Sequence, residues 1–143
     1  MKNYKINVIH EKLLADTTTP VSIYLRLRDI FPNTVLLESS DYHSRENSMS
    51  YVCCEPIAGI VLENETLTKT YPDESKIVLE KGSFELIDEV SAYRKSFETT
   101  TNPELKFVTD GLFGYFTHEA VEHFEDIKLK KDENNERNIP VMQ

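Results

Sequence analysis

The sequence is poor in residues that build several common kinds of site. It has no tryptophan, four glycines, and two cysteines, Cys53 and Cys54, which are adjacent. Neighbouring cysteines rarely form a disulfide with each other and the sequence has no third, so the pair predicts a reducing, cytoplasmic location. A vicinal dithiol could bind a soft metal or sense oxidants. Free cysteines are more often small buried hydrophobic residues, and we expect that role here.

Long apolar stretches and a surplus of positive charge are also missing. No apolar run approaches the roughly 18 residues that a membrane span requires. The opening "MKNYKINVIHEKLLAD" lacks the uninterrupted apolar region and small-residue cleavage site of a signal peptide. With 16 Lys and Arg against 25 Asp and Glu, the net charge is -9. This balance argues against nucleic acid or an anionic membrane as the main partner, but it does not bear on a small-molecule pocket.

Glycine is too sparse for a phosphate-binding loop. None of the four glycines is part of a G-x-G-x-x-G or Walker A pattern. Gly111 and Gly114 lie three positions apart in a strand-like segment, where glycine usually marks a bulge or a close backbone approach.

What is present indicates one ordinary domain of the α+β class. The chain has 143 residues, 39% of them hydrophobic, which is enough for a core. Apolar periodicity predicts helices at 20–31, 83–97 and 117–125 and strands at 4–9, 34–39, 48–54, 57–64, 66–71 and 107–116. Thr19 and Thr117 are the expected helix N-caps. Segments 57–64 and 66–71 form a predicted hairpin, and 71–83 and 98–106 are expected connections. Without a regular β-α-β repeat, we expect a mostly antiparallel sheet with flanking helices.

The segment "HEAVEH" is the nearest approach to a metal-binding motif. It has one residue more between His118 and His123 than the H-E-x-x-H pattern of zinc proteases. Helix positions i and i+4 project about 40° apart, whereas i and i+5 differ by about 140°. The two histidines therefore cannot hold one ion together from a regular helix, and we expect a solvated helix face and no metal site.

The segment "LLESS" ends a predicted strand with a carboxylate and two hydroxyls. Glu38 shares a strand face with Leu36, and burying it without a partner would be costly. One interpretation is that the strand reaches the surface here and Glu38 is solvated. The other is that Glu38 and Ser39 line a pocket for a small ligand with an ammonium group and an apolar body. The residues alone leave both open.

Two segments resemble the chorismate-utilising enzyme family, in particular anthranilate synthase component I. In that family a strand ending L-L-E-S is followed by an R-Y-S-F-I-G-x-x-P-like strand, and here the second part reads "SMSYVCCEP". Ser50, Tyr51 and Pro56 match, Cys53 replaces the usual glycine, and Ser48 stands where arginine is frequent.

The second segment, "DGLFGYFTHEAVEHFED", resembles the family's G-G-L-x-G-Y motif and the F-E that follows it. Asp110 replaces the first glycine. The matching positions are Gly111, Leu112, Gly114, Tyr115, Phe124 and Glu125. Together the two motifs span most of the chain.

The resemblance implies a fold, an activity and a regulatory site. The chain would be an N-terminal domain, residues 1–143, of an α/β/β/α sandwich. The whole enzyme is a lyase that converts chorismate and ammonia to anthranilate and pyruvate with Mg²⁺. A glutamine amidotransferase subunit, component II, delivers the ammonia, and tryptophan inhibits. Ser39 would contact tryptophan, Glu38 would brace the pocket or pair with the ammonium, and Ser50 is a weaker candidate.

The family's magnesium-binding and chorismate-binding residues lie in the C-terminal two-thirds of a longer chain. We therefore expect no catalytic or metal-binding residue here, no turnover by the 143 residues alone, and weak tryptophan binding. The abrupt ending "IPVMQ" suggests a fragment, with exposed apolar surfaces where the remainder would pack. The charged run 126–138 is expected to be a mobile loop.

Two other functions stay open from the sequence. Component I of aminodeoxychorismate synthase uses the same substrates in folate synthesis, although the intact "LLES" favours the anthranilate enzyme. A stand-alone small-molecule-binding module is the alternative of a different class.

Overall fold

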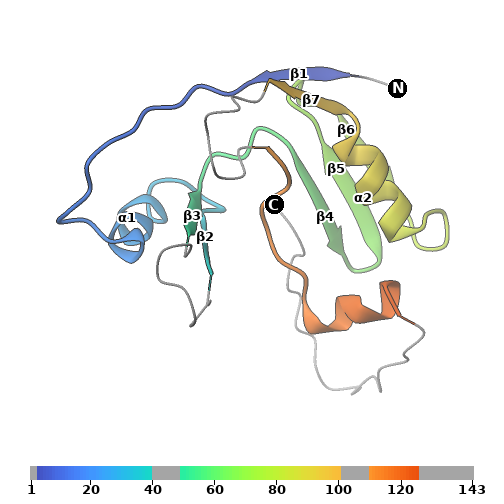
Figure 1. Cartoon of the computed structure of the whole chain (residues 1–143). Helices are drawn as coiled ribbons and strands as arrows, with labels where there is room; N and C mark the ends of the chain where they lie inside the picture. Colours follow the sequence, from blue (N-terminus) through green and yellow to red (C-terminus); the bar gives the residue numbers. More distant parts are fainter. Residues whose placement is uncertain (1–2, 40–48, 101–109, 126–143) are drawn as a thin grey trace. The chain divides into compact units, whose positions relative to one another are not determined.

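The computed structural model describes residues 3–39, 49–100 and 110–125. The chain divides into two compact units (Figure 1). One comprises His10–Pro56, and the other joins Met1–Ile9 to Ile57–Gln143. We call them the inserted unit and the main unit and describe each by itself. Among the described residues no helix has the length and apolar character needed to cross a bilayer. The predicted loop 126–138 lies outside the described residues.

The inserted unit begins with helix α1 (Pro20–Leu27). Thr19 is its N-cap, as predicted. The Thr19 hydroxyl accepts from the Ser22 N–H and the Ser22 hydroxyl accepts from the Thr19 N–H, both at 3.1 Å, which satisfies two N–H groups at the helix start. The helix ends at Leu27, earlier than predicted. The Phe31 N–H donates to the Leu27 carbonyl (2.8 Å) in a closing turn. Pro32 then disfavours helical geometry at Phe31, so the helix does not resume.

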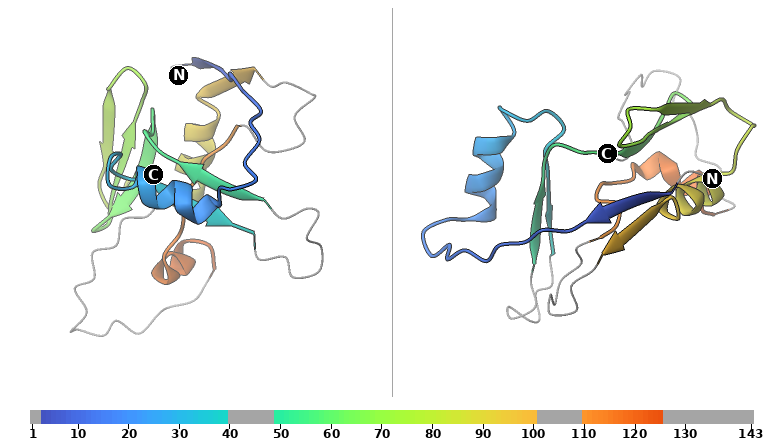
Figure 2. Two further views of the ribbon diagram at one scale, coloured as in Figure 1. Left: turned by 90° about the vertical axis from the view of Figure 1, so that its left-hand side faces the viewer. Right: turned by 90° about the horizontal axis from the view of Figure 1, so that it is seen from above.

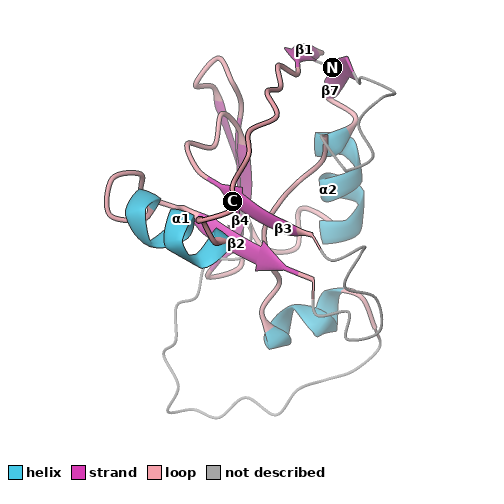
Figure 3. Ribbon diagram, turned by 60° about the vertical axis from the view of Figure 1, so that its left-hand side comes forward, coloured by secondary structure: helices cyan, strands magenta, loops and turns pink. Residues whose placement is uncertain are grey.

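Strands β2 (Val35–Glu38) and β3 (Ser50–Cys53) form an antiparallel pair in this unit. Both were predicted, and α1 lies against them (Figure 3). None of the described residues between positions 10 and 56 is fully buried. Apolar side chains such as Leu14 (87% exposed) and Ile30 (69%) remain in contact with solvent. A two-stranded sheet with one helix is close to the smallest arrangement that can be stable.

The main unit contains a three-stranded antiparallel sheet in the order β4-β5-β6. Its strands are β4 (Gly59–Glu63), β5 (Thr66–Thr70) and β6 (Lys76–Leu79). The β4–β5 hairpin is confirmed. Its two-residue turn places Asn64 and Glu65 at φ 48° and 64°, as in a type I′ turn. Segment 71–83 was expected to be a polar connection, and this was wrong. A turn in which Tyr71 N–H bonds to the Ser75 carbonyl (3.0 Å) returns the chain along β5, so β6 forms.

Helix α2 (Leu86–Arg94) is shorter than the predicted 83–97, and strand β7 (Phe97–Thr100) follows it. The expectation of a loop from Glu98 was wrong, because β7 pairs in parallel with β1 (Tyr4–Asn7), a strand that was predicted. Figure 2 shows the two strands side by side. The Ser96 hydroxyl donates to the Ala92 carbonyl (3.1 Å) where the helix gives way to the strand.

The last described segment, 110–125, departs from prediction. No strand forms in its first part, and 107–109 lie outside the described residues. The predicted α-helix is a 3₁₀ helix, η2 (His118–His123), and Thr117 stands at its N-cap position without a side-chain hydrogen bond to it. A 3₁₀ helix places residues five apart about 120° apart around its axis. The geometric objection to joint zinc binding by His118 and His123 therefore applies here too.

The core of the main unit joins the sheets to α2. The buried apolar residues in contact are Ile60, Leu67, Tyr71, Leu86 and Tyr93. Aromatic rings connect the parallel strands β1 and β7 to this core. Tyr4 of β1 stacks on Tyr71 (5.4 Å between centroids), and Phe97 of β7 packs edge-on against Tyr93 (5.1 Å). Such ring pairs contribute about 0.5–1.5 kcal/mol beyond area burial. The α-helices and predominantly antiparallel strands of the described residues confirm the α+β class.

Candidate functional site

The predicted effector residues lie at one end of the β2–β3 pair. Glu38 and Ser50 are directly opposite in the register, with Ser50 Oγ 3.5 Å from Glu38 Oε1. The Ser39 N–H donates to the Met49 carbonyl (3.1 Å), so pairing continues by one residue. Alternation along the strand places the Ser39 side chain on the face opposite to Glu38. All three residues are exposed, and the effector role assigned to them stays a prediction.

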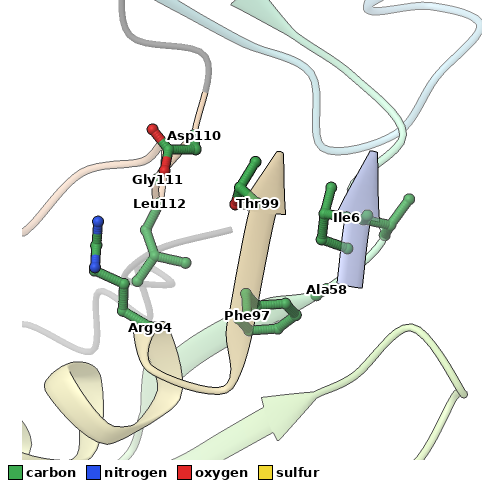
Figure 4. A pocket seen from close by; sticks show the side chains of 9 residues that line it. Ile6, Ala58, Arg94, Phe97, Thr99, Asp110, Gly111 and Leu112 are labelled. Atoms are coloured by element: carbon green, nitrogen blue, oxygen red, sulfur yellow. The ribbon is translucent and has the colours of Figure 1, made fainter. Parts of the chain in front are cut away.

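A cavity in the main unit is a second candidate. It has a volume of ≈ 180 Å³ and lies where β1, β7, the end of α2 and the segment after position 110 meet (Figure 4). Ile6, Ala58, Phe97 and Leu112 supply apolar surface. A concave apolar site with a few polar groups is the usual form of a small-molecule pocket.

Three polar residues line the same cavity: Arg94 at the end of α2, Thr99 on β7, and Asp110. Arg94 and Asp110 lie toward one end of the cavity and Ile6 toward the other in Figure 4. Within the described ranges, the side chains of Arg94 and Asp110 form no ion pair or hydrogen bond. Two charges of opposite sign, without a partner among the described residues, therefore border one apolar cavity.

Gly111 shapes the wall of this cavity through its backbone. Its φ of 146° lies in a region that residues with a side chain rarely adopt. A Cβ added at Gly111 would meet nothing within 4 Å, so the requirement for glycine is conformational rather than steric.

Sequence reasoning did not select Arg94 or Thr99, and it noticed Asp110 only as a departure from the family motif. That substitution of a carboxylate for glycine was the one signal available. The other two residues reach the cavity through the helix-to-strand transition and the parallel pairing of β7, neither of which was predicted.

The described part of the chain gives little support for a metal-binding site or a reactive cysteine. These residues contain no group of three or more His, Cys, Asp or Glu side chains that could hold a metal ion. Cys53 and Cys54 are free thiols and half-buried. Burial, with a smaller effect of Cys54, raises the pKa of the Cys53 thiol, which disfavours the reactive thiolate.

Comparison with known proteins gives one consistent result. No protein-family model and no solved structure matches the chain. Seven curated proteins match, and all are named anthranilate synthase component 1. The protein of Aquifex aeolicus is 28% identical over 135 residues, which cover 90% of this chain and 26% of the relative. The protein of Neisseria meningitidis serogroup B is 30% identical over 115 residues, covering 80% and 23%.

The Pseudomonas aeruginosa protein is 31% identical over 118 residues, which cover 78% of this chain and 22% of the relative. The chain thus spans about a quarter of the length of the relatives it matches. The resemblance drawn from the two motifs is confirmed: over most of its length, the chain is similar to part of anthranilate synthase component 1.

Proposed function

We propose that this chain forms the N-terminal, effector-binding part of an anthranilate synthase component I. The observation that carries the proposal is the shared name of all seven relatives, together with the two sequence motifs. The whole enzyme would be a lyase of tryptophan biosynthesis that converts chorismate and ammonia to anthranilate and pyruvate. Ammonia would come from a glutamine amidotransferase partner, component II. The free cysteines support a cytoplasmic location.

We propose that the conversion of chorismate to anthranilate takes place outside these 143 residues. No described residues cluster in a way that fits Mg²⁺, a cation that needs several oxygen ligands. We propose that Mg²⁺ and chorismate bind to the part of the relatives that has no counterpart in this chain, within the larger two-sheet sandwich. The 143 residues alone are therefore predicted to be inactive.

The effector site is placed at Glu38, Ser39 and Ser50. Support comes from the position of the Glu38 carboxylate opposite the Ser50 hydroxyl on an exposed strand end. A carboxylate so placed can accept charge-assisted hydrogen bonds from the ammonium of tryptophan. Ser39 provides a further contact at the strand end, from the opposite face of the strand.

Component I of aminodeoxychorismate synthase and a stand-alone binding module are the alternatives. The names of the relatives favour the anthranilate enzyme over the first. An experiment distinguishes the proposal from a stand-alone binding module, because such a module would not be expected to support catalysis by a chorismate-utilising enzyme.

The test is a chimera in which this chain replaces the matching quarter of the Aquifex aeolicus enzyme. Anthranilate formation from chorismate, ammonium and Mg²⁺ is followed by fluorescence. We expect turnover by the chimera, and none by the truncated relative or by the chain alone. A folded chimera without turnover overturns the proposal. A chimera that turns over but ignores tryptophan overturns the effector role alone.

A further inference from the structure

The cavity between β1, β7 and the end of α2 combines two charges of opposite sign with an apolar wall. Arg94 can donate two parallel N–H bonds to a carboxylate, a geometry that lysine cannot reproduce. Asp110 can accept from an ammonium. Since neither side chain has a charged or hydrogen-bonding partner within the described ranges, both are available to a ligand.

The size of the cavity indicates which apolar groups it can hold. An engineered cavity of about 150 Å³ accommodates benzene, which has six heavy atoms. The volume of ≈ 180 Å³ therefore suits an apolar group of about four to seven heavy atoms. An aliphatic chain or one aromatic ring fits this volume.

We propose that this cavity binds a zwitterionic α-amino acid with an aliphatic or single-ring side chain. The carboxylate pairs with Arg94 and the ammonium with Asp110. The side chain packs on Ile6, Phe97 and Leu112, and the Thr99 hydroxyl offers a hydrogen bond near the polar end. A ligand with only one charge would leave either Arg94 or Asp110 without a partner. The site therefore favours zwitterions over ligands with a single charge.

This inference does not rest on the proposed function. The predicted tryptophan site uses residues of the inserted unit, whereas every residue of this cavity belongs to the main unit. The two sites can therefore be tested separately, and either can fail alone.

The experiment titrates the 143-residue chain with L-leucine and with L-phenylalanine, followed by amide chemical shifts in NMR. Two analogues of leucine serve as ligand controls: 4-methylpentanoate, which lacks the ammonium, and 3-methylbutylamine, which lacks the carboxylate. We expect saturable binding of leucine or phenylalanine at concentrations up to about 10 mM. We expect affinity for each analogue to be lower by about three- to tenfold, because a charged contact at a solvent-exposed rim is partly screened.

Variants locate the binding. Arg94→Gln and Asp110→Asn should each weaken leucine binding by about three- to tenfold. Lys95→Gln, which removes the adjacent exposed cation outside the cavity, should leave it unchanged. Circular dichroism verifies that each variant is folded. Absence of binding at about 10 mM, equal affinity for leucine and 4-methylpentanoate, or unchanged binding in both rim variants would each overturn the proposal.

Discussion

The Tyr93 hydroxyl donates a hydrogen bond to the Thr70 carbonyl at 2.5 Å, joining helix α2 to the central strand β5. Tyr93 is 1% exposed. Tyr4 belongs to the same ring cluster, but its hydroxyl is buried without a hydrogen-bond partner within the described ranges. Two tyrosines in one core thus differ in whether their hydroxyl is satisfied.

Removing these two hydroxyls should have opposite effects. Tyr93→Phe leaves the Thr70 carbonyl without its partner and should lower the free energy of unfolding by about 1–3 kcal/mol. Tyr4→Phe removes a buried polar atom that makes no bond, so it should be neutral or stabilising. Urea unfolding followed by circular dichroism measures both. Equal losses in the two variants would contradict the assignment of the bond.

The same tyrosine should make stability depend on alkaline pH. Burial, and secondarily the neighbouring Tyr71, raises the pKa of Tyr93 above the ordinary value of 10.0. Above about pH 10 the unfolded chain therefore releases this proton before the folded chain does. The contribution of Tyr93 is complete below that pH and decreases as the pH rises towards the folded-state pKa. Urea midpoints across this range should decrease less steeply for Tyr93→Phe than for the wild type, and parallel curves would refute the prediction.

Local signals predicted much of this fold. The reciprocal bonds of Thr19 and Ser22 and the two-residue hairpin turn depend on neighbouring residues, and both follow from short-range chemistry. Strand β6 was missed because its apolar run, Ile77 to Leu79, does not alternate with polar residues, and strand β7 because Phe97 is its one apolar residue. Strand β7 also needs β1 as its partner, which lies at the far end of the unit in sequence.

The candidate cavity escaped prediction for the same reason. Arg94 and Thr99 become neighbours of Asp110 only through the parallel pairing and the path of the chain after it. The proposed effector residues, in contrast, could be chosen without the structure. They were selected from sequence, and the adjacency of Glu38 and Ser50 follows from strand register alone.

An ion pair between Lys69 on β5 and Glu89 on α2 provides a further test. The Lys69 side chain is 9% exposed and that of Glu89 is 25% exposed. Glu89→Leu leaves the deeper ammonium unpaired and should cost about 3 kcal/mol, whereas Lys69→Met leaves a better-solvated carboxylate and should cost about 1 kcal/mol. The double variant should recover part of the loss. Additive losses in a urea double-mutant cycle would show that the pair is not coupled.

The β4–β5 turn holds Glu65 at φ 64°, a conformation that disfavours residues with a Cβ. Glu65→Gly and Glu65→Ala both remove its surface ion pair with Lys81. They differ only in backbone preference, so the glycine variant should be more stable by about 1 kcal/mol. Thermal and urea unfolding provide the comparison. An alanine variant of equal or greater stability would argue against the turn geometry.

Regulation can be tested in the chimera with Ser39→Phe. The aromatic ring would block the side of the proposed effector site that Ser39 lines, so the tryptophan concentration for half-inhibition should rise by about tenfold or more, equivalent to at least 1.4 kcal/mol. Turnover without tryptophan should change little. Ser91→Phe, at an exposed serine of helix α2, is the matched control. Unchanged inhibition in the Ser39 variant counts against the assigned role.

The parallel pairing of β1 with β7 has a consequence for synthesis of the protein. Asn7 and Thr100, which meet at the end of this pair, are 93 positions apart in sequence. At ribosomal rates of about 5–20 residues per second, the first strand must wait on the order of 5–20 s for its partner to emerge. During that interval its backbone edge and aromatic ring remain open to other chains. Cotranslational chaperones therefore have a clear target at strand β1.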